Sequence, residues 1–348
     1  MEGLKGLATG IGSLPYIDCE AALDLIFKHC PEIPFWPQLP KLNVREGMVA
    51  QFREGLPFMS EDENGLILST FDEADKDKNL ETYYEHIIAK DLEYFRISED
   101  YAQGLHRFYQ RLKKSEDLQG ILCIKGHTIG PFTFAASLTD DKGVAFLHDP
   151  VMMQAILKGL LMKASWQINL FREFGKKILF FIDEPYLGCF GSAFTPINRE
   201  EVVKQLTEFC EPLKSQDCLL GVHCCGNTDW SMLMEVEHLG IISFDAFNFL
   251  DRMVLYADAL KAFFSRGGML CWGIVPTQLS TGLETAEVLI RKLKVGINAL
   301  VGKGLEEEVL FENMLVSPSC GLGTFAPEKA QKVLALLAEV SYHIRKYY

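Results

Sequence analysis

The strongest constraint on the fold is a repeated alternation of short apolar runs with stretches of helical periodicity. Eight such runs occur along the 348-residue chain, at 7–13, 33–38, 120–126, 178–185, 219–226, 240–247, 268–276 and 309–321. Runs that are apolar on both faces are typical of a parallel sheet covered by helices. Helical patterns follow most of them, for example from Asn198, which stands as an N-cap ahead of Glu200 and Glu201. Eight strand–helix repeats predict an α/β fold, a closed (β/α)8 TIM barrel.

A long excursion, about residues 43–118, separates the second run from the third. Its acidic stretch 60–79 is predicted to form a solvated hairpin, and helices such as one over 81–95 are expected to follow. The chain shows neither an internal repeat of solenoid length nor a low-complexity linker. We therefore expect a single barrel domain, residues 1–348, in which 43–118 is a helical and hairpin insertion after the second strand.

Charge and composition restrict the classes of partner. The formal net charge is −13 at pH 7 and no block of lysine or arginine is present, which argues against binding to a nucleic-acid backbone. No run approaches the roughly 18 uninterrupted apolar residues of a membrane span, and the N-terminus lacks the pattern of a signal peptide. Ten cysteines in such a chain predict free thiols rather than disulfides. We expect a cytoplasmic protein that binds neither nucleic acid nor membranes.

The residues that close the predicted strands are the candidates for a functional site, since barrel active sites are built at the carboxyl ends of the strands. These positions are polar and rich in metal ligands: Ser13, Gln38, Asp183, Glu184, His223, Cys225, Asp245 and Cys320. His223 and Cys225 are separated by one residue, so on an extended segment both side chains point to the same face. Cys224 would then point the other way, into the wall or core.

One histidine and two thiolates are the ligands that zinc prefers. Cys320 lies at the end of the eighth run, so it would meet His223 and Cys225 over the mouth of the barrel, and Asp245 would provide the fourth ligand. Two thiolates and a carboxylate leave a net negative charge on the centre, which favours activating a bound thiolate over polarising water. Asp245 has an alternative role as the cap of the following helix.

The remaining polar candidates each carry two interpretations. Asp183 and Glu184 would serve in binding or catalysis, or form a structural carboxylate pair before a proline. Ser13 would cap a helix, or belong to a glycine–serine turn that offers donors to a carboxylate. Lys125 and His127 lie near the end of the third run, where hydrogen bonding within a loop is the expected role.

Six segments carry a family resemblance: TGIGSLP (9–15), GPFTFAASL (130–138), IDEP (182–185), HCCGN (223–227), IISFDAF (241–247) and SPSCGLGT (317–324). In this order they resemble the cobalamin-independent methionine synthase family, within the superfamily of uroporphyrinogen decarboxylase and the methylcobamide:thiol methyltransferases. The resemblance covers nearly the whole chain. It implies a barrel like the catalytic half of the two-barrel methionine synthases.

The resemblance also implies a cofactor and an activity. Zinc would be held by His223, Cys225 and Cys320, with Asp245 where the family usually has a glutamate. Zinc would lower the pKa of a substrate thiol, and the thiolate would attack a methyl group in line. The implied reaction is methyl transfer to homocysteine, which gives methionine and belongs to methionine biosynthesis.

Further positions follow from the same resemblance. Asp183 would contact the amino group of homocysteine, and Ser13 its carboxylate. The family's second acidic partner of the amine has no clean match here, where Gln38 or Glu46 would take its place. The family's late histidine, which assists a folate leaving group, is absent from 273–278, GIVPTQ. A methyl-corrinoid protein is therefore a more natural donor than folate, because its leaving group needs no proton.

Two alternatives stay open beside this interpretation. One is a methylcobamide:thiol methyltransferase that acts on another thiol, and the other is a non-catalytic barrel with a closed four-ligand zinc site. Asp183 favours an amino-acid thiol over coenzyme M, which has no ammonium group to pair with it. Porphyrinogen decarboxylation has little support, because that branch needs an arginine-rich N-terminal motif and LATGIGSLPYID contains no arginine.

Overall fold

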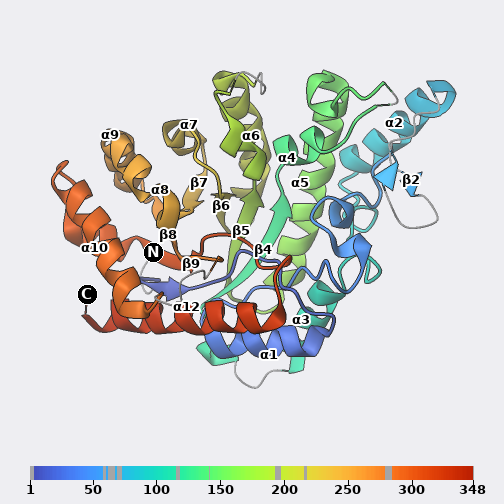
Figure 1. Ribbon diagram of the computed structural model, residues 1–348. Coiled ribbons are helices and arrows are strands. Elements are labelled where there is room, and N and C mark those ends of the chain that lie inside the picture. Colours follow the sequence, from blue (N-terminus) through green and yellow to red (C-terminus); the bar gives the residue numbers. More distant parts are fainter. Residues whose placement is uncertain are drawn as a thin grey trace.

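The computed structural model describes residues 4–57, 60–61, 67–68, 73–114, 118–140, 142–192, 197–214, 218–278 and 284–347. Seven parallel strands curl into a partial barrel with helices around the outside (Figure 1). The strand order is β1-β9-β8-β7-β6-β5-β4. The strands are β1 (Leu7–Ala8), β4 (Cys123–Ile129), β5 (Lys177–Asp183), β6 (Cys218–Cys224), β7 (Leu239–Phe244), β8 (Met269–Val275) and β9 (Met314–Pro318).

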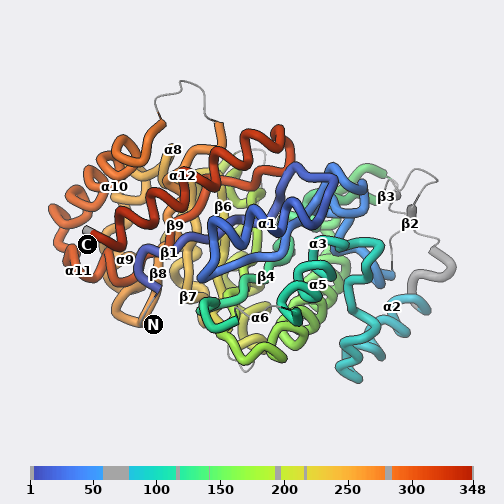
Figure 2. The backbone as a smooth tube through the Cα atoms, turned by 90° about the horizontal axis from the view of Figure 1, so that it is seen from below, coloured from blue at the N-terminus to red at the C-terminus, as the bar shows by residue number. Residues whose placement is uncertain are grey.

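Helices connect successive strands and cover the outer face of the sheet. They are α1 (Cys19–His29), α4 (Pro131–Ala136), α5 (Pro150–Arg172), α6 (Arg199–Lys214), α7 (Trp230–Glu235), α8 (Ala246–Met253), α9 (Ala257–Ser265), α10 (Ala286–Val301), α11 (Glu307–Glu312) and α12 (Pro327–Tyr347). Single 3-10 turns are η3 (Leu118–Gly120), η4 (Phe146–His148), η5 (Pro185–Cys189) and η6 (Val254–Tyr256). The first and last of the α-helices, α1 and α12, lie side by side below the sheet (Figures 1 and 2). Among the described helices, none has the length and apolar character needed to cross a bilayer.

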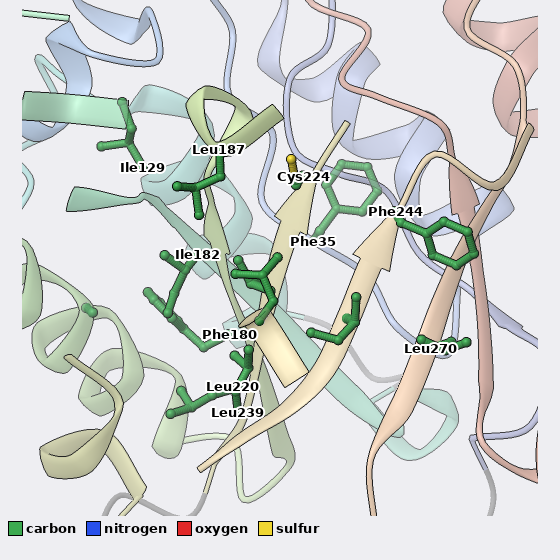
Figure 3. Packing of buried hydrophobic residues seen from close by; sticks show 14 of the residues in the cluster. Phe35, Ile129, Phe180, Ile182, Leu187, Leu220, Cys224, Leu239, Phe244 and Leu270 are labelled. Atoms are coloured by element: carbon green, nitrogen blue, oxygen red, sulfur yellow. The ribbon is translucent and has the colours of Figure 1, made fainter. Parts of the chain in front are cut away.

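Side chains of each strand alternate between the interior of the curl and the helical layer. Leu179 and Phe181 of β5 belong to a compact interior cluster with residues of the neighbouring strands. Phe180 and Ile182 of the same strand pack on the opposite side, in the larger cluster beneath the helices (Figure 3). Cys224 belongs to this outer cluster and is fully buried. The prediction that Cys224 points into the wall is therefore confirmed.

The prediction of a closed eight-stranded barrel is wrong for the second strand. Residues 33–38 form two isolated parallel bridges, Phe35 with Lys125 of β4 and Ser13 with Gln38, and no continuous ladder. Pro34 and Pro37 lack the N–H that a ladder requires, which accounts for the interruption. The segment still lies between the two edges of the sheet, because it hydrogen-bonds to β4 and to the chain that follows β1. The amide of Lys125 donates to the Pro34 carbonyl, and the amide of Gln38 donates to the Gly12 carbonyl.

The insertion is built mainly of short elements and two helices. It contains η1 (Val44–Glu46), η2 (Ala50–Phe52), α2 (Glu73–Ile88) and α3 (Gln103–Lys114). The predicted hairpin is present where β2 (Ser60–Glu61) pairs antiparallel with β3 (Ile67–Leu68). Its remaining residues 62–66 and 69–72 lie outside the described residues, and α2 begins inside the stretch predicted as hairpin. In Figure 1, α2 and β2 stand to one side of the sheet.

Helix α3 fixes the irregular segment 33–38 through a close backbone approach. A Cβ atom at Gly104 would collide with the carbonyl oxygen of Pro37. We expect Gly104→Ala to lower the free energy of unfolding by about 1–3 kcal/mol, as overpacking of a tight contact does. Denaturant unfolding of purified protein measures it. Gly120→Ala is the control, because a Cβ there meets no atom within 4 Å; an equal loss in both variants would contradict the packing argument.

Candidate metal centre and substrate cavity

The carboxyl ends of β5, β6 and β7 bring polar side chains to one level of the curl. Asp183 is the last residue of β5 and pairs in register with His223 of β6. His223 in turn pairs with Ser243 of β7. Because side chains in register on parallel strands point to the same face, these three residues lie side by side at the edge where the candidate residues were predicted.

His223 is held in one orientation by a single hydrogen bond. Its Nδ1 lies 3.0 Å from Ser243 Oγ. Its Nε2 is buried and has no hydrogen-bond partner among the described residues. With the proton on Nδ1 donated to Ser243, the lone pair on Nε2 is free for a ligand, which is the usual arrangement of a metal-binding histidine.

Two thiols complete a compact cluster with His223. The ligand atoms of His223, Cys225 and Cys320 all lie within 4.8 Å of one another. Tetrahedral zinc with bonds of about 2.0–2.3 Å needs its ligand atoms about 3.6 Å apart, so small adjustments suffice. The hydrogen bond from Cys225, together with the His223 imidazole, lowers the pKa of Cys320. Cys225, which keeps the shared proton, has its pKa raised by that hydrogen bond and by burial.

These residues pass a test of fit to zinc. One unpartnered imidazole nitrogen and two adjacent sulfurs are donors that zinc accepts, and three such residues could hold the ion with a position left open. Sequence reasoning identified all three residues and their convergence is observed here. It missed Ser243, because the position of this side chain depends on the local geometry of β7.

Ser243 faces His223 because β7 contains one extra residue. Leu220 pairs with Leu239, but the next residue of β6, Gly221, pairs with Ile241, so Gly240 is unpaired. Such a bulge shifts the following side chains to the opposite face of the strand. It therefore places Ser243 on the same face as His223.

Asp245 was predicted as the fourth ligand, but it does not belong to the cluster of ligand atoms. It is the N-cap of α8: its Oδ1 accepts from the Asn248 amide at 2.9 Å and its Oδ2 from Asn248 Nδ2 at 2.7 Å. Both carboxylate oxygens are thus engaged, and the helix-cap alternative describes what the structure shows. Burial raises the pKa of Asp245. The side chain lines a cavity beside the two thiols without joining them.

A cavity of about 350 Å³ lies on one side of the thiol pair. Its walls include four predicted residues, Ser13, Gln38, Asp183 and His223, and also His127. Burial raises the pKa of Asp183 to about 6, although the nearby Lys125 ammonium opposes this shift. Asp183 Oδ1 has no hydrogen-bond partner among the described residues. This carboxylate is therefore available to a cationic group in the cavity.

Ser13 and Gln38 are tied to the wall of the same cavity. Ser13 Oγ accepts from the Gly323 amide at 3.2 Å, which leaves its hydroxyl proton free to be donated. Gln38 Nε2 donates to Gln51 Oε1 at 2.7 Å, and this amide is therefore partly committed. Ser13 is the better placed of the two to donate to a ligand.

Two of the candidate carboxylates have structural partners instead. Glu46 does not line the cavity, and its oxygens accept from the backbone amides of Leu39 at 3.1 Å and Gln103 at 2.8 Å. Its predicted contact with substrate is replaced by a role in tying α3 to the chain after Gln38. Glu184 accepts from the amides of Phe132 at 2.9 Å and Thr133 at 2.8 Å, and so caps α4.

A second cavity, about 520 Å³, is also lined by the two thiols. It is lined by Asp245, Asn248, Phe247, Thr277 and Phe325, among others. It shares Cys225, Cys320, Gly321 and Thr324 with the first cavity. The two thiols therefore line both cavities.

No protein-family model matches the chain, and no curated protein matches its sequence. The chemistry of the site must therefore be argued from its own residues.

Loss of the hydrogen bond between His223 and Ser243 should weaken metal binding. We expect Ser243→Ala to weaken zinc binding roughly 10–100-fold, because the imidazole loses the partner that sets its tautomer and orientation. Competition with a chromophoric chelator measures the affinity. Ser341→Ala is the control. Ser341 is another buried serine, on α12, and its Oγ donates to the Gly6 carbonyl, so its loss should leave the zinc affinity unchanged. Equal affinity in wild type and Ser243→Ala would refute the role of this hydrogen bond.

The raised pKa of Glu46 should make the free energy of unfolding depend on pH. Burial raises its pKa in the folded protein to about 7 from the usual 4.5. Between these values the folded state binds more protons than the unfolded state, so this group makes the free energy of unfolding fall as pH rises. We expect Glu46→Gln to remove a slope of up to about 1.4 kcal/mol per pH unit in this window. Unfolding curves between pH 4.5 and 7 test it; parallel pH profiles would contradict it.

Proposed function

We propose that this protein is a zinc-dependent methyltransferase that moves a methyl group to the thiol of an amino acid, with homocysteine as the acceptor and methionine as the product. The observation that carries the proposal is the meeting of two cavities at the Cys225–Cys320 thiol pair. Methyl transfer in line requires acceptor and donor to reach the reacting carbon from opposite sides. Two spaces that share the same sulfurs suit this requirement.

His223, Cys225 and Cys320 are the residues that would hold zinc. Three protein ligands leave a coordination position for a substrate, as in catalytic rather than structural zinc sites. When bound, zinc would lower the pKa of the substrate thiol and keep it as a thiolate near neutral pH. The engagement of both Asp245 oxygens with Asn248 favours this open arrangement over a closed four-ligand site.

The cavity of about 350 Å³ suits the amino-acid end of such a thiol. Asp183, with one unpartnered oxygen, would accept hydrogen bonds from the substrate ammonium. Ser13 would donate its hydroxyl proton to the substrate carboxylate. These two contacts fix the substrate while its sulfur points toward the thiol pair.

The reaction balances without an acid from the chain when the donor's leaving group needs no proton. The thiol proton leaves to solvent before transfer; the new sulfur–carbon bond then forms as the donor–carbon bond breaks, and the donor keeps the electron pair. The segment 273–278, next to the second cavity, carries no histidine that would protonate a folate leaving group. This supports a methyl-corrinoid protein as the donor.

Two alternatives predict different behaviour. A methylcobamide:thiol methyltransferase for another thiol would accept an ammonium-free thiol, such as coenzyme M, at least as well as homocysteine. A non-catalytic zinc barrel would bind zinc in a shell that no thiol enters. The unpartnered Asp183 oxygen favours homocysteine over the first alternative.

The first test is the metal itself. We expect about one zinc per chain in purified protein, lost in Cys320→Ser and in His223→Ala because each removes a ligand of a three-residue site. X-ray absorption at the zinc edge should gain a sulfur neighbour when homocysteine is added. Transfer from methylcobalamin, followed as methionine formed, then tests the reaction.

Cys189→Ser is the matched control, because Cys189 is an exposed thiol outside the cluster. It should keep both the zinc and the response to homocysteine. Absence of zinc from wild-type protein after reconstitution, or a zinc shell that ignores every thiol, would refute the methyltransferase proposal.

A further inference from the structure

His127 is a buried histidine whose ring is clamped on both faces. Its imidazole stacks on Trp36 with ring centroids 3.9 Å apart and an interplanar angle of 13°. A Cβ atom at Gly12 would lie 2.8 Å from His127 Cε1 and 3.0 Å from Nε2, so the Gly12 backbone covers the ring closely. The ring is therefore fixed, and its nitrogens form an edge that the stacking contacts do not use.

The clamp is itself held by a chain of hydrogen bonds. Trp36 Nε1 donates to Gln167 Oε1 at 3.1 Å, and Gln167 Nε2 donates to the backbone carbonyl of His127 at 3.1 Å. Helix α5, which carries Gln167, thus ties the tryptophan and the strand together. The imidazole is positioned in advance for whatever contacts its edge.

Among the described residues, none forms a hydrogen bond with the ring nitrogens of His127. Both Nδ1 and Nε2 of His127 are buried without a hydrogen-bond partner, and the residue is 2% exposed. His127 nevertheless lines the cavity of about 350 Å³ together with Ser13 and Asp183. Sequence reasoning assigned it to hydrogen bonding within a loop, and the structure shows no such bond. Buried polar atoms normally have partners, so this edge is suited to a ligand in the cavity.

The electrostatic surroundings indicate the charge of the group that would meet this edge. Burial, with the Lys125 ammonium two residues earlier on β4, lowers the pKa of His127. The ring is thus neutral near neutral pH and offers one N–H donor. Lys125 Nζ donates to the Ile11 carbonyl at 2.7 Å beneath this part of the wall. A hydrogen-bond donor beside a buried ammonium favours an anionic partner.

We propose that His127 is a specificity-determining residue that donates a ring N–H to the carboxylate of the acceptor thiol, beside the Ser13 hydroxyl. The inference rests on the proposed function, because it takes an amino-acid thiol as the occupant of the cavity. Asp183 would then select for the ammonium, and His127 with Ser13 for the carboxylate. The protein would accordingly distinguish an amino-acid thiol from an otherwise identical amine lacking the carboxylate.

The test compares two thiols on zinc-loaded protein, homocysteine and 3-aminopropane-1-thiol, which lacks only the carboxylate. In His127→Phe the aromatic ring still stacks on Trp36 but has no N–H. We expect its affinity for homocysteine, measured by calorimetry, to fall roughly tenfold or more, as when a hydrogen bond to a charged group is lost. Its affinity for 3-aminopropane-1-thiol should change less than about twofold, because this ligand makes no such bond.

His127→Gln is the rescue variant, because its side-chain amide restores a donor, and it should recover part of the preference for homocysteine. Zinc content and thermal melting of each variant establish that the fold and metal site persist. Equal weakening of both thiols in His127→Phe, or no change in either, would overturn the role of His127 while leaving methyl transfer intact. Wild-type protein that binds neither thiol would overturn both this inference and the proposed function.

Discussion

The site depends on one extra residue in β7. If Gly240 were paired with Gly221 in a regular ladder, Ile242 rather than Ser243 would stand opposite His223, and β7 would present its other set of side chains to the interior. The imidazole would then face a branched hydrocarbon and lose its hydrogen-bond partner at Nδ1. Bulges are found beside active sites because they re-aim a side chain at little cost to the remaining ladder. Here the same shift also sends Phe244 outward, into the core beneath the helices.

Interior polarity increases from the lower layer of the sheet to its carboxyl edge. The lower layer is apolar and includes Leu179 and Met269. Lys125, which pairs in register with Leu179, lies fully buried with its ammonium 4.6 Å from the Phe181 ring centroid, and burial lowers its pKa to about 8. Lys125 and Asp183 interact, each opposing the effect of burial on the other. A titratable pair of opposite charge thus lies at the cavity, with Asp183 in its wall and Lys125 buried next to Asp183.

Sequence patterns predicted the parts of the fold that depend on local periodicity. Seven of the eight apolar runs became strands, because a buried parallel strand has a continuous apolar signature. The run 33–38 has the same hydropathy but contains two prolines, and its hydrogen bonding is accordingly interrupted. The last run was too long, since its first residues belong to α11 and only Met314–Pro318 forms β9.

For the site, the convergence of His223, Cys225 and Cys320 followed from strand ends and spacing alone. Asp245 could not be decided in that way, because an aspartate after a strand serves equally as a ligand or as a helix cap. Glu46 was misplaced because its partners, the amides of Leu39 and Gln103, are brought together only by the tertiary fold. Ser243 and the unsatisfied edge of His127 depend on a bulge and on packing, neither of which has a local sequence signal.

The sheet has a weakly hydrogen-bonded seam, which consists of the interrupted segment 33–38 between β1 and β4. The other adjacent strands share ladders of several residue pairs or, for β1 and β9, of two, whereas β1 and β4 are joined across this segment by single bridges. Amide hydrogen exchange by local opening is fastest where few backbone hydrogen bonds must break together. Trp36 and Gln38 lie in this seam, and Gln38 lines the cavity. The wall of the cavity is therefore part of the sheet's least cooperative region, so a ligand held there would reduce the rate of local opening across the seam.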